Sequence, residues 1–241
     1  MTIGESESVH LRPDLREIGR RAAAGGLTLG ARQLAGSIVA IAAGITLARA
    51  LPPAVFGVYA VVTFVTRFFV HFSDVGLGAA LIRKSRVDAE EFSTAFVMQQ
   101  VLVLLAVVVL WFTAETWASA YDISGASTMI RVLALSFWVA SLGTIPSLRL
   151  EREMRFPSLA FADLTSTIAY HVATVVLALA GYGVWSFIVG ALLRSLTSAL
   201  VLNLVSPWRP SLRFRSDLAR DLLSFGLPFQ LNKIVTLVKD N

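Results

Sequence analysis

The chain has no cysteine, and charged residues make up only 15% of its 241 residues. Without cysteine it forms no disulfide and no thiolate metal site. Its three histidines, His10, His71 and His171, show no metal-ligand spacing, so we expect no metal ion. The chain also lacks a Walker A sequence and the Gly-x-Ser-x-Gly elbow of a hydrolase. We therefore expect neither ATP-driven work nor enzymatic catalysis by this chain, and no cofactor.

Hydrophobic residues, by contrast, make up 56% of the chain and gather into long runs. A run of about 20 apolar residues can cross the roughly 30 Å hydrocarbon core of a bilayer as a helix. The runs predict an all-α, polytopic transmembrane bundle with six complete spans, at residues 27–50, 55–82, 92–114, 129–148, 159–180 and 184–205. A truncated seventh span is expected over 222–241, so that residues 27–221 form one transmembrane lobe with its cytoplasmic loops.

Lysine and arginine are distributed unevenly over the loops between these runs. Fourteen lie in the N-terminal tail and in the loops after the second, fourth and sixth spans, whereas only Arg49 and Arg131 lie on the opposite side. Because positively charged loops stay in the cytoplasm, we expect residues 1–26 to form a cytoplasmic tail. Within it, residues 15–24 fit a short interfacial helix and a disordered segment equally well. Orientation and anionic lipid headgroups account for the net charge of +5, and we expect no nucleic-acid partner.

Ionisable residues inside the apolar runs are candidate functional residues, because a charge at membrane depth costs a few kcal/mol or more unless it is paired or hydrated. Arg67, His71 and Asp74 follow the spacing i, i+4, i+7, which predicts one helix face. One interpretation is a cavity lining that contacts an anionic substrate. The other is a local Arg–Asp bracket near the cytoplasmic end of the second span, which suits Asp74 better.

Four further residues stand within the other runs. Arg32 is close enough to the cytoplasmic end of the first span to reach the headgroups, although its small neighbours also suit a cavity. Arg194 is near the middle of the sixth span and is predicted to pair with Asp163 or to contact substrate. Asp163 and His171 are eight residues apart on the fifth span, where they could relay protons or serve a structural ion pair.

Several stretches together resemble the bacterial polysaccharide biosynthesis and export family, the oligosaccharide-lipid flippases of the multidrug/oligosaccharidyl-lipid/polysaccharide exporter superfamily. The matching stretches are LARALPPAVFGVYAVV, FSDVGLGAALIRK, EEFSTAFVMQQ, RVLALSFWVASLGTIPSLRLEREMRF, GYGVWSFIVGALLRSL, SPWRPSLRF and LLSFGLPFQLNKIV, in this order between residues 47 and 235. We expect the chain to correspond to the N-terminal half of such a protein.

The resemblance implies a two-lobed helical bundle around a central cavity in the bacterial inner membrane. It implies alternating access that carries polyprenyl-diphosphate-linked oligosaccharide to the outer leaflet, with membrane lipids, a polysaccharide polymerase and glycosyltransferases as candidate partners. A diphosphate needs cationic donors, and arginine offers a planar fork for it. We therefore expect Arg32, Arg67 and Arg194 to be the cavity cations. The alternatives are a multidrug or small-molecule antiporter, which would favour acidic cavity residues, and a membrane scaffold that transports nothing.

Overall fold

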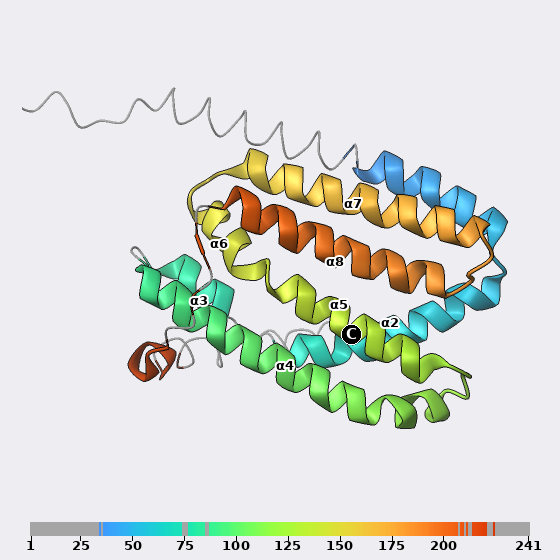
Figure 1. The fold of residues 1–241 in the computed structure, drawn as a ribbon, viewed down its shortest axis with the longest axis horizontal. Helices are drawn as coiled ribbons and strands as arrows, with labels where there is room; N and C mark the ends of the chain where they lie inside the picture. Colours follow the sequence, from blue (N-terminus) through green and yellow to red (C-terminus); the bar gives the residue numbers. More distant parts are fainter. Residues whose placement is uncertain are drawn as a thin grey trace, which may run out of the picture.

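The computed structural model describes residues 34, 36–73, 77–84, 87–206, 208–209, 211, 214–220 and 224, and every regular element in these ranges is a helix. The long helices lie side by side in the order α4 (Ala89–Ala120), α5 (Ala126–Ser141), α8 (Trp185–Val205) and α7 (Phe156–Leu179) (Figure 1). Helix α2 (Pro53–Ser73) packs across α4 and α5. The predicted all-α class is thus confirmed for this part of the chain.

The core lies where α2, α4, α5 and α8 meet. Its members share complete or nearly complete burial of an aliphatic side chain, and include Val62, Val65, Leu110, Ile130 and Ile188. The outward faces carry exposed large apolar side chains instead, among them Phe64, Leu105, Phe112, Val176 and Leu204. An apolar exterior around a well-packed interior is what a lipid-facing helical bundle requires.

Four helical stretches are long and apolar enough to cross a membrane: Ala89–Ala120, Ala126–Arg152, Phe156–Leu179 and Trp185–Val205. They correspond to the spans expected at 92–114, 129–148, 159–180 and 184–205. The described parts of the first two expected spans are shorter apolar helices, Gly36–Ala50 and Pro53–Phe69. Residues 1–33 and the expected seventh span, apart from residue 224, lie outside the described residues. The total of six complete spans therefore stays a prediction.

The span expected over 55–82 is described in two parts, helix α2 up to Ser73 and helix α3 (Leu77–Arg83). Residues 74–76 lie outside the described residues, so the continuity of this span stays a prediction. The guanidinium of Arg152 donates hydrogen bonds to the carbonyls of Leu81, Ile82 and Lys84, the last at 2.9 Å, and so satisfies groups that the end of α3 leaves unpaired.

The span expected over 129–148 is interrupted, since α5 ends at Ser141 and α6 (Thr144–Arg152) begins after a break at Leu142 and Gly143. Pro146 has no N–H to donate to the carbonyl of Leu142 four residues earlier. The side-chain amide of Asn203, on α8, donates to that carbonyl instead, with Nδ2 3.1 Å from the oxygen. A hydrogen bond from a neighbouring helix therefore satisfies the carbonyl that the break leaves unpaired.

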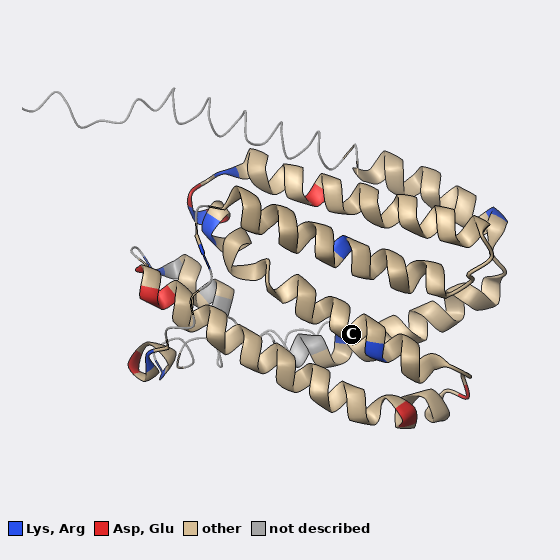
Figure 2. Ribbon diagram, viewed as in Figure 1, with Lys and Arg blue, Asp and Glu red and all other residues tan. Residues whose placement is uncertain are grey.

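The loops divide into two groups at opposite ends of the bundle (Figures 1 and 2). One end holds α3, α6 and residues 206, 208–209, 211 and 214–220, and most of the described charged residues gather there (Figure 2). At this end Lys84 pairs with Glu91 at 2.8 Å, and Arg215 pairs with Glu90 at 3.1 Å. The turns at 120–126 and 179–185 lie at the other end. The arginine-rich loops that the structure describes thus lie at one end of the bundle, and the membrane side that they occupy remains a prediction.

Candidate functional site

An ion pair joins α7 and α8 partway between the two ends of the bundle. Nη2 of Arg194 lies 3.6 Å from Oδ1 of Asp163. Asp163 is seven residues from the start of α7, and Arg194 is eleven residues from the end of α8. At 1.5 Å per residue they lie about 10 and 16 Å from the charged end of the bundle, well within a core of roughly 30 Å. The predicted pairing of Arg194 with Asp163 is therefore present.

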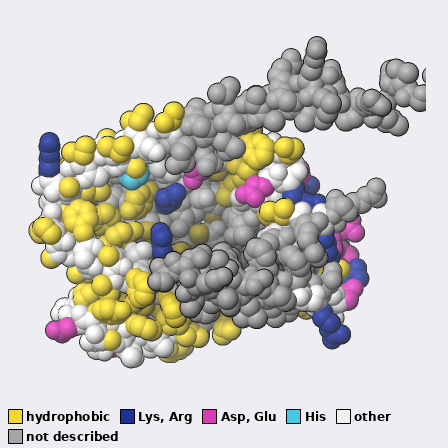
Figure 3. All heavy atoms as spheres, turned by 180° about the vertical axis from the view of Figure 1, so that it is seen from behind, with side chains coloured by type: hydrophobic (Ala, Val, Ile, Leu, Met, Phe, Trp, Pro, Cys, Tyr) yellow, Lys and Arg dark blue, Asp and Glu magenta, His cyan; other side chains and the backbone are white. Residues whose placement is uncertain are grey.

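Both members of this pair face an open surface. The side chains of Arg194 and Asp163 are 48% and 45% exposed, so they are not buried between α7 and α8. Figure 3 shows basic and acidic side chains standing within an otherwise largely hydrophobic face. Charged groups at this depth do not face lipid at acceptable cost, so the face that carries them must meet water or further protein.

His171 belongs to the same region. It follows Asp163 by eight residues on α7, and its ring packs edge-on against Tyr170 with centroids 4.9 Å apart. The Nδ1 atom of His171 is buried and has no hydrogen-bond partner among the described residues. The structure thus pairs Asp163 with Arg194 and places His171 about two turns further along α7, and proton relay by these residues stays a prediction.

The candidates on the first two spans are described only in part. Arg67 lies on α2 with an exposed side chain, and within the described ranges it forms no ion pair. His71 lies one turn further along α2, but its side chain is outside the described residues. Asp74 follows the end of α2 and, like Arg32, lies outside the described residues. The polar stripe of Arg67, His71 and Asp74 therefore remains a prediction.

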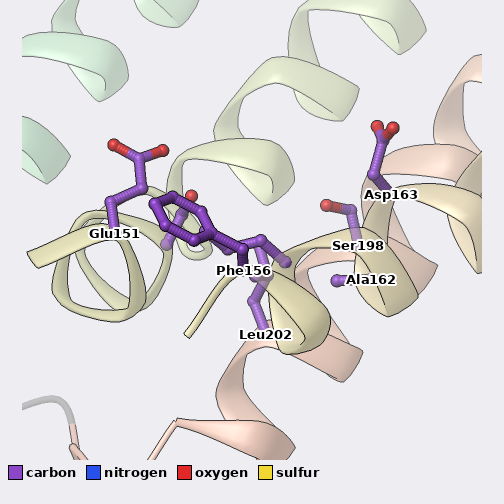
Figure 4. Close-up of a pocket in the computed structure, with 8 residues that line it drawn as sticks. Glu151, Phe156, Ala162, Asp163, Ser198 and Leu202 are labelled. Carbon is purple, nitrogen blue, oxygen red and sulfur yellow. The ribbon is translucent and has the colours of Figure 1, made fainter. Parts of the chain in front are cut away.

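A groove of about 470 Å³ opens between α6, α7 and α8 beside Asp163 (Figure 4). Its lining combines carboxylates, hydroxyls, an aromatic ring and aliphatic groups, from Ser147, Glu151, Phe156, Leu159, Ala162, Asp163, Ser198 and Leu202. A second cavity of about 530 Å³ adjoins it and shares Ser147, Glu151 and Leu202. This groove is not evident from the sequence, because its polar residues come from three segments and none is unusual within its own segment.

These features define the class of protein. An all-helical bundle with four membrane-capable helices, an apolar exterior and a charged face at mid-depth is a multi-pass membrane protein. Residues 46–241 match the polysaccharide biosynthesis protein family. The chain belongs to that family, as the resemblance in the sequence indicated.

Two characterised proteins are similar to this chain. It is 28% identical over 183 residues to the succinoglycan biosynthesis transport protein ExoT of Rhizobium meliloti (strain 1021), covering 75% of this chain and 37% of ExoT. It is 23% identical over 161 residues to the teichuronic acid biosynthesis protein TuaB of Bacillus subtilis (strain 168), covering 66% of this chain and 33% of TuaB. The matched region thus spans about a third of the length of either relative. No solved structure matches the chain significantly.

Proposed function

We propose that this chain forms one lobe of a transporter that moves polyprenyl-diphosphate-linked oligosaccharide across the bacterial cytoplasmic membrane for surface polysaccharide synthesis. Family membership over residues 46–241 supports a role in polysaccharide biosynthesis. The transport function in the name of ExoT supports export as the step concerned. The matched share of both relatives supports a larger whole protein, of which this chain supplies one lobe.

The observation that carries the proposal is the exposed position of Arg194 at mid-depth in the bundle. A diphosphate carries at least two negative charges and crosses a hydrocarbon core only with cationic partners. A guanidinium forms two parallel hydrogen bonds with phosphate oxygens, which suits it to this ligand. In the proposal Asp163 holds Arg194 in place when substrate is absent, and Arg32 and Arg67 complete the cationic lining.

The proposed arrangement in the membrane has six spans with the N-terminus in the cytoplasm. The arginine-rich loops lie at one end of the bundle and would face the cytoplasm. A substrate loaded from that side meets the groove first and Arg194 deeper in the bundle. Exposure of the same face to one side and then the other, by movement against a second lobe, is the proposed route across the membrane.

Complementation of a flippase-deficient strain tests this function. The full-length protein, meaning this chain together with the proposed second lobe, is expected to restore surface polysaccharide. Its Arg32→Ala and Arg67→Ala variants are expected to reach the membrane but to export none. Comparison with this 241-residue chain alone shows whether a second lobe is needed. Normal export by both variants would remove the cationic-cavity part of the proposal.

A second candidate function, export of cationic small molecules, is favoured by one observation. The groove contains the carboxylates of Glu151 and Asp163, and no lysine or arginine is among its described lining residues. Carboxylates would attract a cationic drug. The same flippase-deficient strains distinguish the two functions. An antiporter would raise their resistance to cationic dyes and would not restore polysaccharide export.

A further inference from the structure

We infer that the groove between α6, α7 and α8 binds the sugar units of the lipid-linked substrate, next to the diphosphate at Arg194. This inference rests on the proposed function, and it assigns a part of the substrate to a surface that the arginines do not account for. Its basis is the chemistry of the lining, the availability of its polar atoms and its position beside the ion pair.

The lining has the three kinds of group that sugars need. Carboxylate oxygens accept hydrogen bonds from sugar hydroxyls, and serine hydroxyls both donate and accept them. An aromatic ring supplies a flat apolar surface for the C–H face of a pyranose. Figure 4 shows the ring of Phe156 between Glu151 and Ser198, with Asp163 beyond Ser198 and the carboxylates of Glu151 and Asp163 extending to the same side.

Three polar groups of the groove, on Ser147, Glu151 and Ser198, are available for a ligand. Many helical serine and threonine hydroxyls in this protein donate back to a backbone carbonyl, as Thr174 does to Tyr170 and Ser186 to Gly183. Within the part of the chain that the structure describes, the hydroxyls of Ser147 and Ser198 have no hydrogen-bond partner. The carboxylate of Glu151 has none there either. A ligand can therefore bond to these three groups without breaking an existing hydrogen bond.

The size and position of the groove also fit this occupant. A volume of about 470 Å³ lies within the roughly 300–1,000 Å³ of small-molecule sites. Asp163 lines the groove and touches Arg194, so a sugar in the groove lies next to a diphosphate on that guanidinium. The order of groups in the substrate, sugar followed by diphosphate, then matches the order of groups along α7 and α8.

The test compares two lipid probes on the purified full-length protein in nanodiscs. One probe is a polyprenyl diphosphate that carries an oligosaccharide, and the other is the same lipid diphosphate without sugar. Glu151→Gln keeps the shape of the side chain but removes its charge, and Phe156→Ala removes the ring. Glu153→Gln is the matched control, because its carboxylate lies two residues from Glu151, pairs with Arg149 and does not line the groove.

Each groove variant is expected to weaken binding of the sugar-bearing lipid by about fivefold or more, the loss of one charge-assisted hydrogen bond or one stacking contact. Binding of the sugar-free lipid is expected to stay unchanged, as is all binding by the control. The preserved sugar-free affinity also shows that the variants are folded.

Three results would overturn the inference. If the groove variants weaken binding of both lipids equally, or of neither, the groove does not recognise sugar. The proposed function is then left intact, because the wild-type protein still binds the lipid diphosphate. If the wild-type protein binds neither lipid, the proposed function itself fails. If tetraphenylphosphonium competes for the groove and loses affinity in Glu151→Gln, the groove serves cations instead.

Discussion

Nη2 of Arg194 on α8 lies 3.6 Å from Oδ1 of Asp163 on α7, and both side chains remain nearly half exposed. An exposed ion pair in water contributes little, about 0–1 kcal/mol, so this pair is not explained as a source of stability. Within a membrane the pair keeps each charge from standing alone, while the exposed guanidinium can still receive an anionic ligand. The predictions below separate these two roles.

Exchange of the two charges separates structure from ligand binding. The double variant Arg194→Asp with Asp163→Arg keeps an ion pair between α7 and α8 but moves the guanidinium to the other helix. We expect it to reach the membrane at normal levels, as shown by fractionation and immunoblotting, and to export less than about a tenth of the wild-type polysaccharide, since a misplaced group often costs a hundredfold. Full export by the exchanged protein would reduce the pair to a structural device.

The hydrogen bond from Asn203 to Leu142 is predicted to compensate for Pro146. Asn203→Leu leaves the Leu142 carbonyl unpaired and should lower the free energy of unfolding of the full-length protein by about 1–2 kcal/mol. In a Pro146→Ala background the backbone N–H of residue 146 can donate to that carbonyl, so the same substitution should cost much less. Denaturant unfolding in micelles measures both. If Asn203→Leu lowers the free energy of unfolding equally with and without Pro146→Ala, Asn203 does not stabilise the protein through the Leu142 carbonyl.

Gly190 is predicted to set the close contact between α7 and α8. A Cβ atom at residue 190 would lie 2.2 Å from Oγ1 of Thr174 and 3.3 Å from the carbonyl oxygen of Tyr170, which cannot move aside easily. Gly190→Ala should therefore cost about 1–3 kcal/mol. Gly57→Ala is the matched control, because nothing lies within 4 Å of its added Cβ. A helix gains up to about 1 kcal/mol from such a change. Equal thermal midpoints for the two variants would contradict the packing account.

Arg215, which joins residues 214–220 to Glu90 of α4, should be held less firmly by Asp217 in acid. Hydrogen bonds from Arg215 hold the pKa of Asp217 below its usual value, and Arg215 also reaches Glu90. Because the pKa is lower in the folded state, the stabilisation is complete above the ordinary aspartate pKa of about 4 and is lost as the pH falls through the lowered value.

A variant that keeps Trp208 as its sole tryptophan can report this change, since Trp208 packs against Phe96 of α4 with ring centroids 5.5 Å apart. Its fluorescence should be constant from about pH 8 to 5 and change below about pH 4. Asp217→Asn should remove that step. A transition near neutral pH, or one that Asp217→Asn leaves intact, would refute this assignment.

Much of this fold was predictable from apolar run length and loop charge. The spans at 159–180 and 184–205 agree closely with α7 and α8, because Gly181 and Gly183 interrupt the run and adopt positive φ angles. The break within the fourth span was not predictable in this way. Pro146 opens a new helix instead of ending the run, and its compensating donor, Asn203, is distant in sequence.

The candidate site was predictable to the same extent. Arg194 and Asp163 are opposite charges inside successive apolar runs. Their pairing could be expected, because neither charge is tolerated alone in lipid. The groove was not predictable, because Glu151, Phe156 and Ser198 are ordinary residues until the fold places them around one space.

The most direct test of the account measures translocation itself. Proteoliposomes that contain the full-length protein and a polyprenyl-diphosphate-linked oligosaccharide are assayed for movement of the glycan between leaflets with a membrane-impermeant lectin. We expect translocation by the wild-type protein and by Arg131→Gln, whose guanidinium bonds to the backbone of Trp111 away from the site, and none by Arg194→Gln. Translocation by Arg194→Gln at the wild-type rate, or none by the wild-type protein, would contradict the account.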